Sequence, residues 1–194
     1  MINIFEQGYF DAYSNVNLNE AKSEILKHSQ YGASSKTTIF ISHKHDDLPE
    51  LKGLLGFLER YYNVKVYIDS KDPYMPKMTS AETALRIKDK IKNCDKFILL
   101  ATNNAIESKW CNWELGFGDA KKYKDKIALF LMKPSGSNEY LYKGREYMKI
   151  YPYISYFDGS EKFSNGSPIA AGYYVRTEEE NTNYIEPLSE WLKK

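Results

Sequence analysis

The sequence predicts an α/β protein built on a doubly wound, parallel sheet. Four short apolar runs lie at residues 38–41, 64–68, 97–101 and 127–132, and each is bounded by polar or turn residues. Three of them are apolar almost throughout, which is typical of strands buried on both faces. The runs recur roughly every 30 residues, and this spacing leaves room for a crossover helix between parallel strands. The pattern therefore alternates strand and helix, with right-handed crossovers.

Three segments between the runs are predicted to be helices. The first begins near Asp47, an acid placed to cap the helix, and continues with an early proline and leucines three and four residues apart. The second begins from a capping box over 79–82. Its core-facing residues are expected to be Ala84, Leu85, Ile87 and Ile91. The third has competing start signals at 104–107 and Ser108, and should fade near Gly118 or soon after.

The ends of the chain give weaker signals than the middle. Residues 1–35 are predicted to form an N-terminal leader with one helix over 18–26, and residues 36–194 to form the α/β domain. A chain of 194 residues fits one domain with a sizeable core. Near the C-terminus we expect a last strand over 170–175 and a closing helix over 185–192.

Composition excludes several classes of protein. With 27 Lys and Arg against 26 Asp and Glu, charge alone would not hold the chain to nucleic acid or to a membrane, so neither is an expected partner. The longest apolar run, 127–132, is far short of the ~18–20 residues that cross a bilayer. Two cysteines are too few for a disulfide scaffold, and no secretory signal begins the chain. We therefore expect a cytoplasmic location.

Residues that directly follow the strands are the strongest candidates for a site, because ligands of open α/β sheets bind beyond the carboxyl ends of the strands. Ser42, His43 and Lys44 follow the first run, Asp69 to Lys71 follow the second, and Thr102 follows the third. No GxGxxG or GxxxxGK[ST] motif follows any of these strands. A Rossmann hydride-transfer enzyme and a P-loop NTPase are both disfavoured.

Two other chemistries at the first strand end receive little support. The loop holds four side chains of metal-ligand type, namely His43, His45, Asp46 and Asp47. The histidines would need a third ligand from elsewhere, so a polar loop in which Asp47 caps a helix is the preferred interpretation, and no metal is expected. Ser42 lacks the GxSxG elbow of an α/β-hydrolase nucleophile.

The segment 108–114 carries the most informative pattern. Trp110 and Glu114 are four residues apart, so they share one face of a helix. A carboxylate beside indole rings at a strand-end cleft could hold a sugar while a ring stacks on a base. Spacing alone favours the alternative, in which Trp110 and Trp113 belong to the core and Glu114 is a solvated helix residue.

Three blocks of the chain resemble the Toll/interleukin-1 receptor (TIR) domains of bacteria. They are Ile-Phe-Ile-Ser-His at 39–43, Val-Tyr-Ile-Asp at 66–69 and, most specific, Ser-Lys-Trp-Cys-Asn-Trp-Glu-Leu at 108–115. Residues 75–84 also look like those of a bacterial subgroup, and the resemblance covers about 36–133. It implies a flavodoxin-like fold, in agreement with the pattern of strands and helices.

The resemblance also implies an activity and a set of site residues. Catalytic TIR domains cleave NAD⁺ at the nicotinamide–ribose bond, and their essential glutamate corresponds to Glu114. NAD⁺ is then the substrate, and no cofactor is expected. His43 stands where many members have Tyr or Phe, and Lys44 where many have Arg, which would weaken a bidentate phosphate grip. The predicted substrate-binding residues are Ser42, His43, Lys44, Asp69, Lys71, Trp110 and Trp113.

Two functional hypotheses follow from the resemblance. The first is an NAD⁺ nucleosidase or ADP-ribosyl cyclase that produces an ADP-ribose-derived signal, cyclic or conjugated. It resembles the TIR proteins of Thoeris-type antiphage defence, in which a separate effector senses the product. Self-association through the loop Asp69–Met78 is expected to support this activity. The second hypothesis is a scaffold module without enzymatic activity that binds other TIR domains.

Overall fold

The computed structural model describes residues 4–15, 36–68, 80–179 and 182–194. Within this part of the chain eight strands form one sheet in the order β3-β2-β4-β5-β6-β7-β8, with β1 paired to β5 off this path. The strands are β1 (Phe5–Glu6), β2 (Thr38–Ser42), β3 (Lys65–Tyr67), β4 (Lys96–Ala101), β5 (Ile127–Lys133), β6 (Tyr153–Phe157), β7 (Gly172–Glu179) and β8 (Thr182–Pro187). Strands β2 to β6 are parallel, whereas β7 and β8 are antiparallel. The order β3-β2-β4-β5-β6 is that of flavodoxin-like folds, so the predicted fold class is confirmed.

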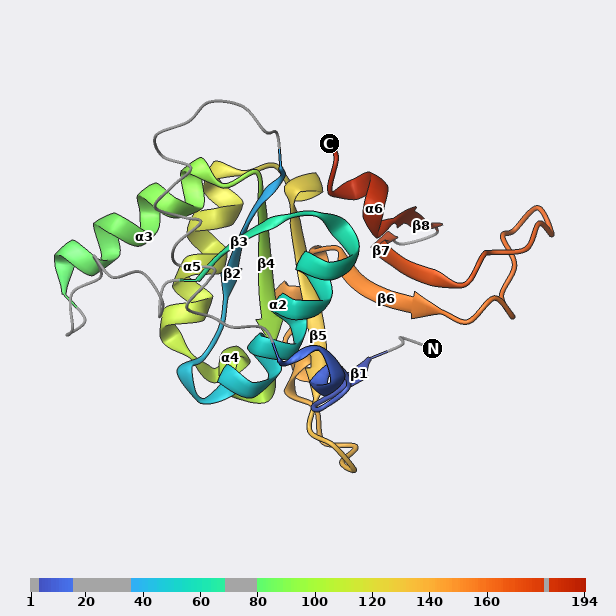
Figure 1. Cartoon of the computed structure of the whole chain (residues 1–194), viewed down its shortest axis with the longest axis horizontal. Helices are drawn as coiled ribbons and strands as arrows, with labels where there is room; N and C mark the ends of the chain where they lie inside the picture. Colours follow the sequence, from blue (N-terminus) through green and yellow to red (C-terminus); the bar gives the residue numbers. More distant parts are fainter. Residues whose placement is uncertain (1–3, 16–35, 69–79, 180–181) are drawn as a thin grey trace.

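Helices cover both faces of this sheet (Figure 1). The α-helices are α2 (Leu48–Tyr62), α3 (Ala81–Asn93), α4 (Asn103–Glu107), α5 (Lys109–Lys121) and α6 (Leu188–Trp191). The 3₁₀ helices are η1 (Asp11–Tyr13), η2 (His45–Asp47), η4 (Lys124–Lys126), η5 (Leu141–Gly144) and η6 (Glu146–Ile150). One core lies between the sheet and α2 with α6, and the other lies between the sheet and α3, α4 and α5. Figure 1 shows α3 and α5 together on one side of the central strands. None of the described helices has the length and apolar character that crossing a bilayer requires.

The four apolar runs of the sequence correspond to β2, β3, β4 and β5, of which β3 is an edge strand and the other three lie inside the sheet. All residues of β4 are buried, and so are all residues of β5 except the last, Lys133. Alternate side chains of these strands enter the two cores: Ile98 and Leu100 pack toward α2, whereas Phe97 and Leu99 pack toward α5. Burial on both faces explains why these runs are apolar almost throughout.

Helix α3 begins one residue later than its start signal suggests. Ser80 is the N-cap, and its hydroxyl accepts from the Thr83 backbone N–H in a capping box that Thr83 completes. Glu82 is therefore not the box residue, and its carboxylate pairs with Arg86 at 2.8 Å instead. Leu85 is 63% exposed, so its predicted place in the core is wrong. Ile87 and Ile91 are buried, as the predicted stripe requires, and Ala84 is half-buried.

Of the two competing start signals of the third helix, Ser108 is used, whereas 104–107 lies inside a separate short helix, α4, that begins from Thr102. The Thr102 hydroxyl caps α4, and the Ser108 hydroxyl accepts from the Cys111 backbone N–H at the start of α5. Two short capped segments therefore replace one helix, with a sharp corner at Ser108. Helix α5 runs past Gly118 to Lys121, and the packing of Gly118 against the Phe97 ring, 3.2 Å from where a Cβ would stand, keeps the helix close to the sheet.

The described part of the N-terminal segment packs on the sheet. Strand β1 pairs in parallel with β5, Phe5 opposite Met132, and Phe10 is buried among α2 and β5. A Cβ on Gly53 of α2 would stand 2.7 Å from the Phe10 carbonyl oxygen, so the close approach requires glycine. The predicted helix over 18–26 and the domain boundary after residue 35 lie outside the described residues, and both stay predictions.

The C-terminal elements differ from the prediction. Two strands, β7 and β8, replace the single strand expected over 170–175, and Ile185 lies in β8 rather than in a helix. The closing helix is only α6, because Pro187 cannot continue the ladder and stands at its N-cap. Trp191 of α6 is buried, donates from Nε1 to the Asp125 carbonyl at 2.6 Å, and lies over the buried Lys96 ammonium at 4.5 Å from the ring centroid.

Candidate functional site

At the carboxyl edge of the parallel sheet, the ends of β2 and β4 lie side by side. Ser42 is the last residue of β2 and pairs in register with Leu99 of β4, whose own strand ends at Ala101. The chain then turns at Thr102 into α4 and enters α5 at Ser108. Parallel pairing therefore places the residues after β2 beside those after β4, as the sequence predicted.

Glu114 of α5 lies at this edge and is deeply buried. Cys111 and Leu115 of α5 pack into the core, and Glu114 is 2% exposed. The Ser42 hydroxyl, itself 1% exposed, donates to the Glu114 carboxylate with 2.5 Å between Oγ and Oε2. The alternative that spacing favoured, a solvated Glu114, is wrong, because α5 turns this side chain toward the end of β2 rather than toward water.

His43 and Lys44 continue from Ser42 along the same edge. His43 is buried, and its Nδ1 lies 3.4 Å from the Ile41 carbonyl oxygen. Lys44 is half-buried and has the extended backbone that precedes η2. Both residues therefore directly follow Ser42, which is one partner of the contact with Glu114.

Asp47 joins the two strand ends and does not cap α2 with its side chain. It is 1% exposed and occupies the N-cap position, but its carboxylate accepts from Thr102 Oγ1 at 2.5 Å and from Asn104 Nδ2 at 2.7 Å. Burial raises the pKa of Asp47 above its ordinary value, while these two hydrogen bonds and the nearby His43 act in the opposite direction. The predicted capping role is thus corrected: the helix begins where expected, and the acid serves a tertiary contact.

Asn112 fixes the corner between α4 and α5. Its side-chain amide donates to the carbonyls of Ile106 at 2.9 Å and Ser108 at 2.8 Å, and its Oδ1 accepts from the Tyr147 hydroxyl. Sequence reasoning named Thr102 as a strand-end residue but did not predict its contact with Asp47, and it assigned no role in the site to Asn104 or Asn112. The signal that could have found these contacts is the position of Thr102 and Asn104 opposite the acids that follow the neighbouring strand.

The two tryptophans of α5 form a half-buried pair next to the site. The rings of Trp110 and Trp113 are 5.0 Å apart between centroids, and Trp113 also stacks on Phe117 at 6.2 Å. The Lys88 ammonium lies 5.7 Å from the Trp113 centroid. Both indoles pack against the core beneath α5, so part of each ring is already in contact with protein.

Several predicted site residues lie outside the described part of the chain. Asp69, Lys71 and the whole loop Asp69–Met78 belong to this group, and their roles stay predictions. Of the side chains considered as metal ligands, His45 and Asp46 are exposed, whereas His43 and Asp47 are buried. Among the residues that the structure describes, no three His, Cys, Asp or Glu side chains come together as a metal site would require.

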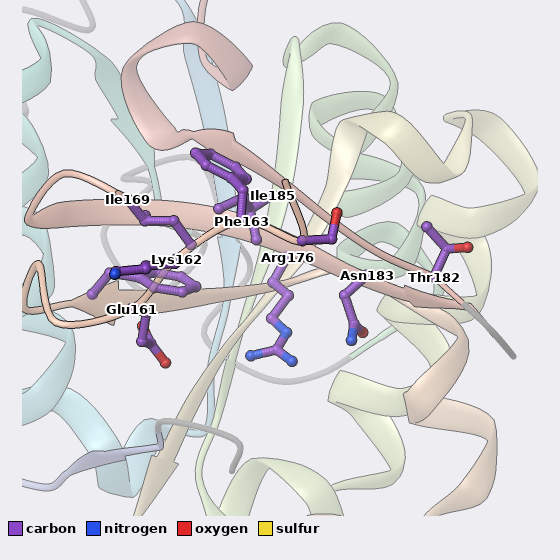
Figure 2. A pocket seen from close by; sticks show the side chains of 10 residues that line it. Glu161, Lys162, Phe163, Ile169, Arg176, Thr182, Asn183 and Ile185 are labelled. Atoms are coloured by element: carbon purple, nitrogen blue, oxygen red, sulfur yellow. The ribbon is translucent and has the colours of Figure 1, made fainter. Parts of the chain in front are cut away.

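A separate cavity lies near the C-terminus. It has a volume of about 720 Å³ and is bordered by β7, β8 and the segment before them (Figure 2). Phe163, Ile169 and Ile185 form its apolar part, and Arg176 contributes its polar part. Arg176 is also paired with Glu178 at 3.4 Å. None of the predicted site residues borders this cavity, so the candidate site remains the carboxyl edge.

Two comparisons relate this chain to known proteins. Residues 39–165 match the family model described as "TIR domain". The chain is 30% identical over 141 residues to a Bacillus cereus (strain MSX-D12) protein named "Probable 3' cyclic ADP-D-ribose synthase ThsB'". This alignment covers 71% of this chain and 71% of the relative. The residues that the family model matches include Ser42, α4 and α5.

Proposed function

Because the chain belongs to the TIR domain family, we propose that it is an NAD⁺-consuming enzyme that cleaves the nicotinamide–ribose bond. The observation that carries this function is the buried carboxylate of Glu114, held by Ser42 at the carboxyl edge of the sheet. The Bacillus cereus relative supports the same chemistry, because its name describes a probable cyclic ADP-D-ribose synthase.

Glu114 has the chemistry that the bond cleavage needs. When the C1′–N bond breaks, nicotinamide leaves with the bonding electron pair as a neutral molecule, and positive charge develops on the ribose. A carboxylate near that carbon stabilises the charge more in the transition state than in the ground state. Because Glu114 is 2% exposed, little water screens this interaction. The same carboxylate can accept hydrogen bonds from ribose hydroxyls and orient the ring.

The fate of the ribosyl cation determines the product. Attack by a nucleophilic group of the same molecule, with loss of a proton, gives a cyclic isomer, whereas attack by water gives ADP-ribose. The name of the Bacillus relative favours cyclisation. The product would then be a signal in antiphage defence that a separate effector senses, in the cytoplasm. Self-association through the loop Asp69–Met78 belongs to the same proposal.

Nicotinamide release from NAD⁺ tests the function directly. The purified chain is incubated with NAD⁺, and mass spectrometry of the products separates hydrolysis, cyclisation and conjugation. Glu114→Gln is expected to lower kcat by about 10²–10³. Glu107→Gln is the matched control, because Glu107 is an exposed acid one helix before Glu114. A folded Glu114→Gln variant that cleaves NAD⁺ at the wild-type rate would refute the assignment and favour a scaffold module.

A further inference from the structure

Asp47 is a buried acid whose position in the chain does not explain its burial. A helix N-cap acid ordinarily accepts from the backbone N–H groups of its own helix and stays near water. Asp47 makes no such bond and is 1% exposed. Burying a carboxylate is unfavourable unless hydrogen bonds replace its hydration, so the contacts that Asp47 makes must account for its place.

The contacts of Asp47 lead toward Glu114 through α4 and α5. Thr102 donates its hydroxyl to Asp47 and accepts from the Ala105 backbone N–H at 3.0 Å, which fixes the first turn of α4. The Asn112 side chain then ties α4 to α5 at the Ser108 corner. Glu114 stands two residues after Asn112 on the same helix.

The chain leads from Asp47 back to Glu114 by a second route. Ser42 ends β2, and only residues 43–46 separate it from Asp47. The Ser42 hydroxyl holds the Glu114 carboxylate at 2.5 Å. One path from Asp47 to the Ser42–Glu114 contact runs through the hydrogen bonds of Thr102 and Asn112, and the other runs along residues 43–46 of the chain. The bond between Asp47 and Thr102 therefore closes a ring of hydrogen bonds and chain segments around the site.

We propose that Asp47 is a positioning residue that holds the Ser42 strand end and the start of α5 in register, and so fixes the Glu114 carboxylate where the ribose cation forms. Because Asp47 would act through Glu114, this role rests on the proposed function. Asp47 has no direct part in the reaction. Its carboxylate is occupied by Thr102 and Asn104. A displacement of the reacting groups by about 1 Å can lower a rate by about 10²-fold, so such positioning has a measurable effect.

Replacing the carboxylate tests the positioning role. Asp47→Asn keeps the shape of the side chain but removes one acceptor and the charge that strengthens both bonds. We expect kcat for nicotinamide release to fall by about 10-fold or more, with KM within about 3-fold of wild type, because Asp47 does not bind substrate. The matched control is Asp46→Asn, which removes the same charge at an exposed neighbouring position. Equal kcat values for the two folded variants would overturn the proposal.

A double-mutant cycle separates positioning from general destabilisation. If Asp47 acts by keeping Ser42 and Glu114 together, Asp47→Asn introduced into a Ser42→Ala background should lower kcat by less than about 3-fold. If the kcat losses of Asp47→Asn and Ser42→Ala simply multiply in the double variant, Asp47 does not act through the Ser42–Glu114 contact. Thr102→Val, which removes the hydroxyl, should lower kcat more than Thr102→Ser, which keeps it. Similar losses for both Thr102 variants would also count against the role of this bond.

The carboxyl resonance of Glu114 gives a readout that does not depend on activity. Protein labelled with ¹³C at the glutamate carboxyl carbon is compared among wild type, Asp47→Asn and Asp46→Asn, and Glu114→Gln identifies the signal. We expect Asp47→Asn to shift this signal and Asp46→Asn to leave it in place. If the wild type does not cleave NAD⁺, the proposed function fails, and this comparison still decides the role of Asp47. An unchanged Glu114 signal in folded Asp47→Asn protein would refute it.

Discussion

The hydrogen bond between Ser42 and Glu114 allows a quantitative prediction for catalysis. Ser42→Ala removes the hydroxyl that donates to Oε2 at 2.5 Å. Both side chains are at most 2% exposed, so bulk water does not reach the Glu114 carboxylate to replace the lost hydroxyl. Hydrogen bonds to charged groups contribute about 1.5–3 kcal/mol, which corresponds to a change in rate of about 10- to 150-fold if the whole contribution is felt in the transition state.

Two effects of the substitution oppose each other. The hydroxyl withdraws charge from the carboxylate, so its removal would strengthen the attraction between Glu114 and a ribose cation. The hydroxyl also restricts the carboxylate to one orientation, so its removal lets the side chain turn away. We expect the orientation effect to dominate, because small displacements of a reacting group lower rates more than a partial change in its charge raises them. The expected kcat of Ser42→Ala is therefore about 10- to 150-fold below wild type.

The assay is initial-rate nicotinamide release at saturating NAD⁺, with circular dichroism to verify folding. Ser155→Ala provides the matched control. Ser155 of β6 is buried to the same degree, and its hydroxyl has no hydrogen-bond partner within the described residues, so the same chemical change should leave kcat unaltered. A kcat for folded Ser42→Ala at or above the wild-type value would show that the hydroxyl does not orient Glu114.

Three further predictions concern stability and use denaturant titration. Gly53→Ala should lower the free energy of unfolding by about 1–3 kcal/mol, because its Cβ would stand 2.7 Å from the Phe10 carbonyl oxygen, whereas Gly116→Ala, with open space around its Cβ, should raise it by about 0.5–1 kcal/mol. Trp191→Ala should lower it by about 3–5 kcal/mol, since a buried ring and its contact with a buried ammonium are lost. Burial raises the pKa of Asp47 in the folded protein above its ordinary value of 3.8. Between that value and the raised pKa the folded state therefore binds more protons than the unfolded state, and wild type should lose stability relative to Asp47→Asn as pH rises through this range. A constant difference over that range would contradict this direction.

Local sequence patterns predicted the centre of the fold because local and tertiary requirements agree there. The strands inside the sheet are apolar on both faces, and the hydroxyls of Ser80 and Ser108 start α3 and α5 within the segments where the sequence carries start signals. The location of the candidate site followed from the same pattern, since parallel strands bring their carboxyl ends to one edge. The C-terminal hairpin gave a weaker signal because β8 is a polar edge strand, and its exposed residues do not need the alternation that a buried face imposes.

The partners of individual polar residues could not be predicted in the same way. Asp47 stands at a helix start, where a local capping bond is the expected use of an acid. Its actual partner Thr102 is 55 residues away, and only the pairing of β2 with β4 brings the two together. Glu114 gave the same difficulty, because helix spacing does not tell which side of α5 faces the sheet edge.

The distribution of buried polar groups indicates which part of the molecule serves function rather than stability. Of the eight buried polar or charged side chains in the described part of the chain, Ser42, His43, Asp47, Thr102 and Glu114 lie at the carboxyl edge. Burying such groups is unfavourable, and replacing a bonded polar pair by apolar groups of similar shape is often neutral or stabilising. We therefore expect the pair of substitutions Asp47→Leu and Thr102→Val to lower the free energy of unfolding by no more than about 2 kcal/mol, which is the cost of losing the Thr102 cap of α4, while NAD⁺ cleavage falls by more than about 10-fold. A parallel loss of stability and activity would mean that these residues build the fold, and that the site depends on them only through folding.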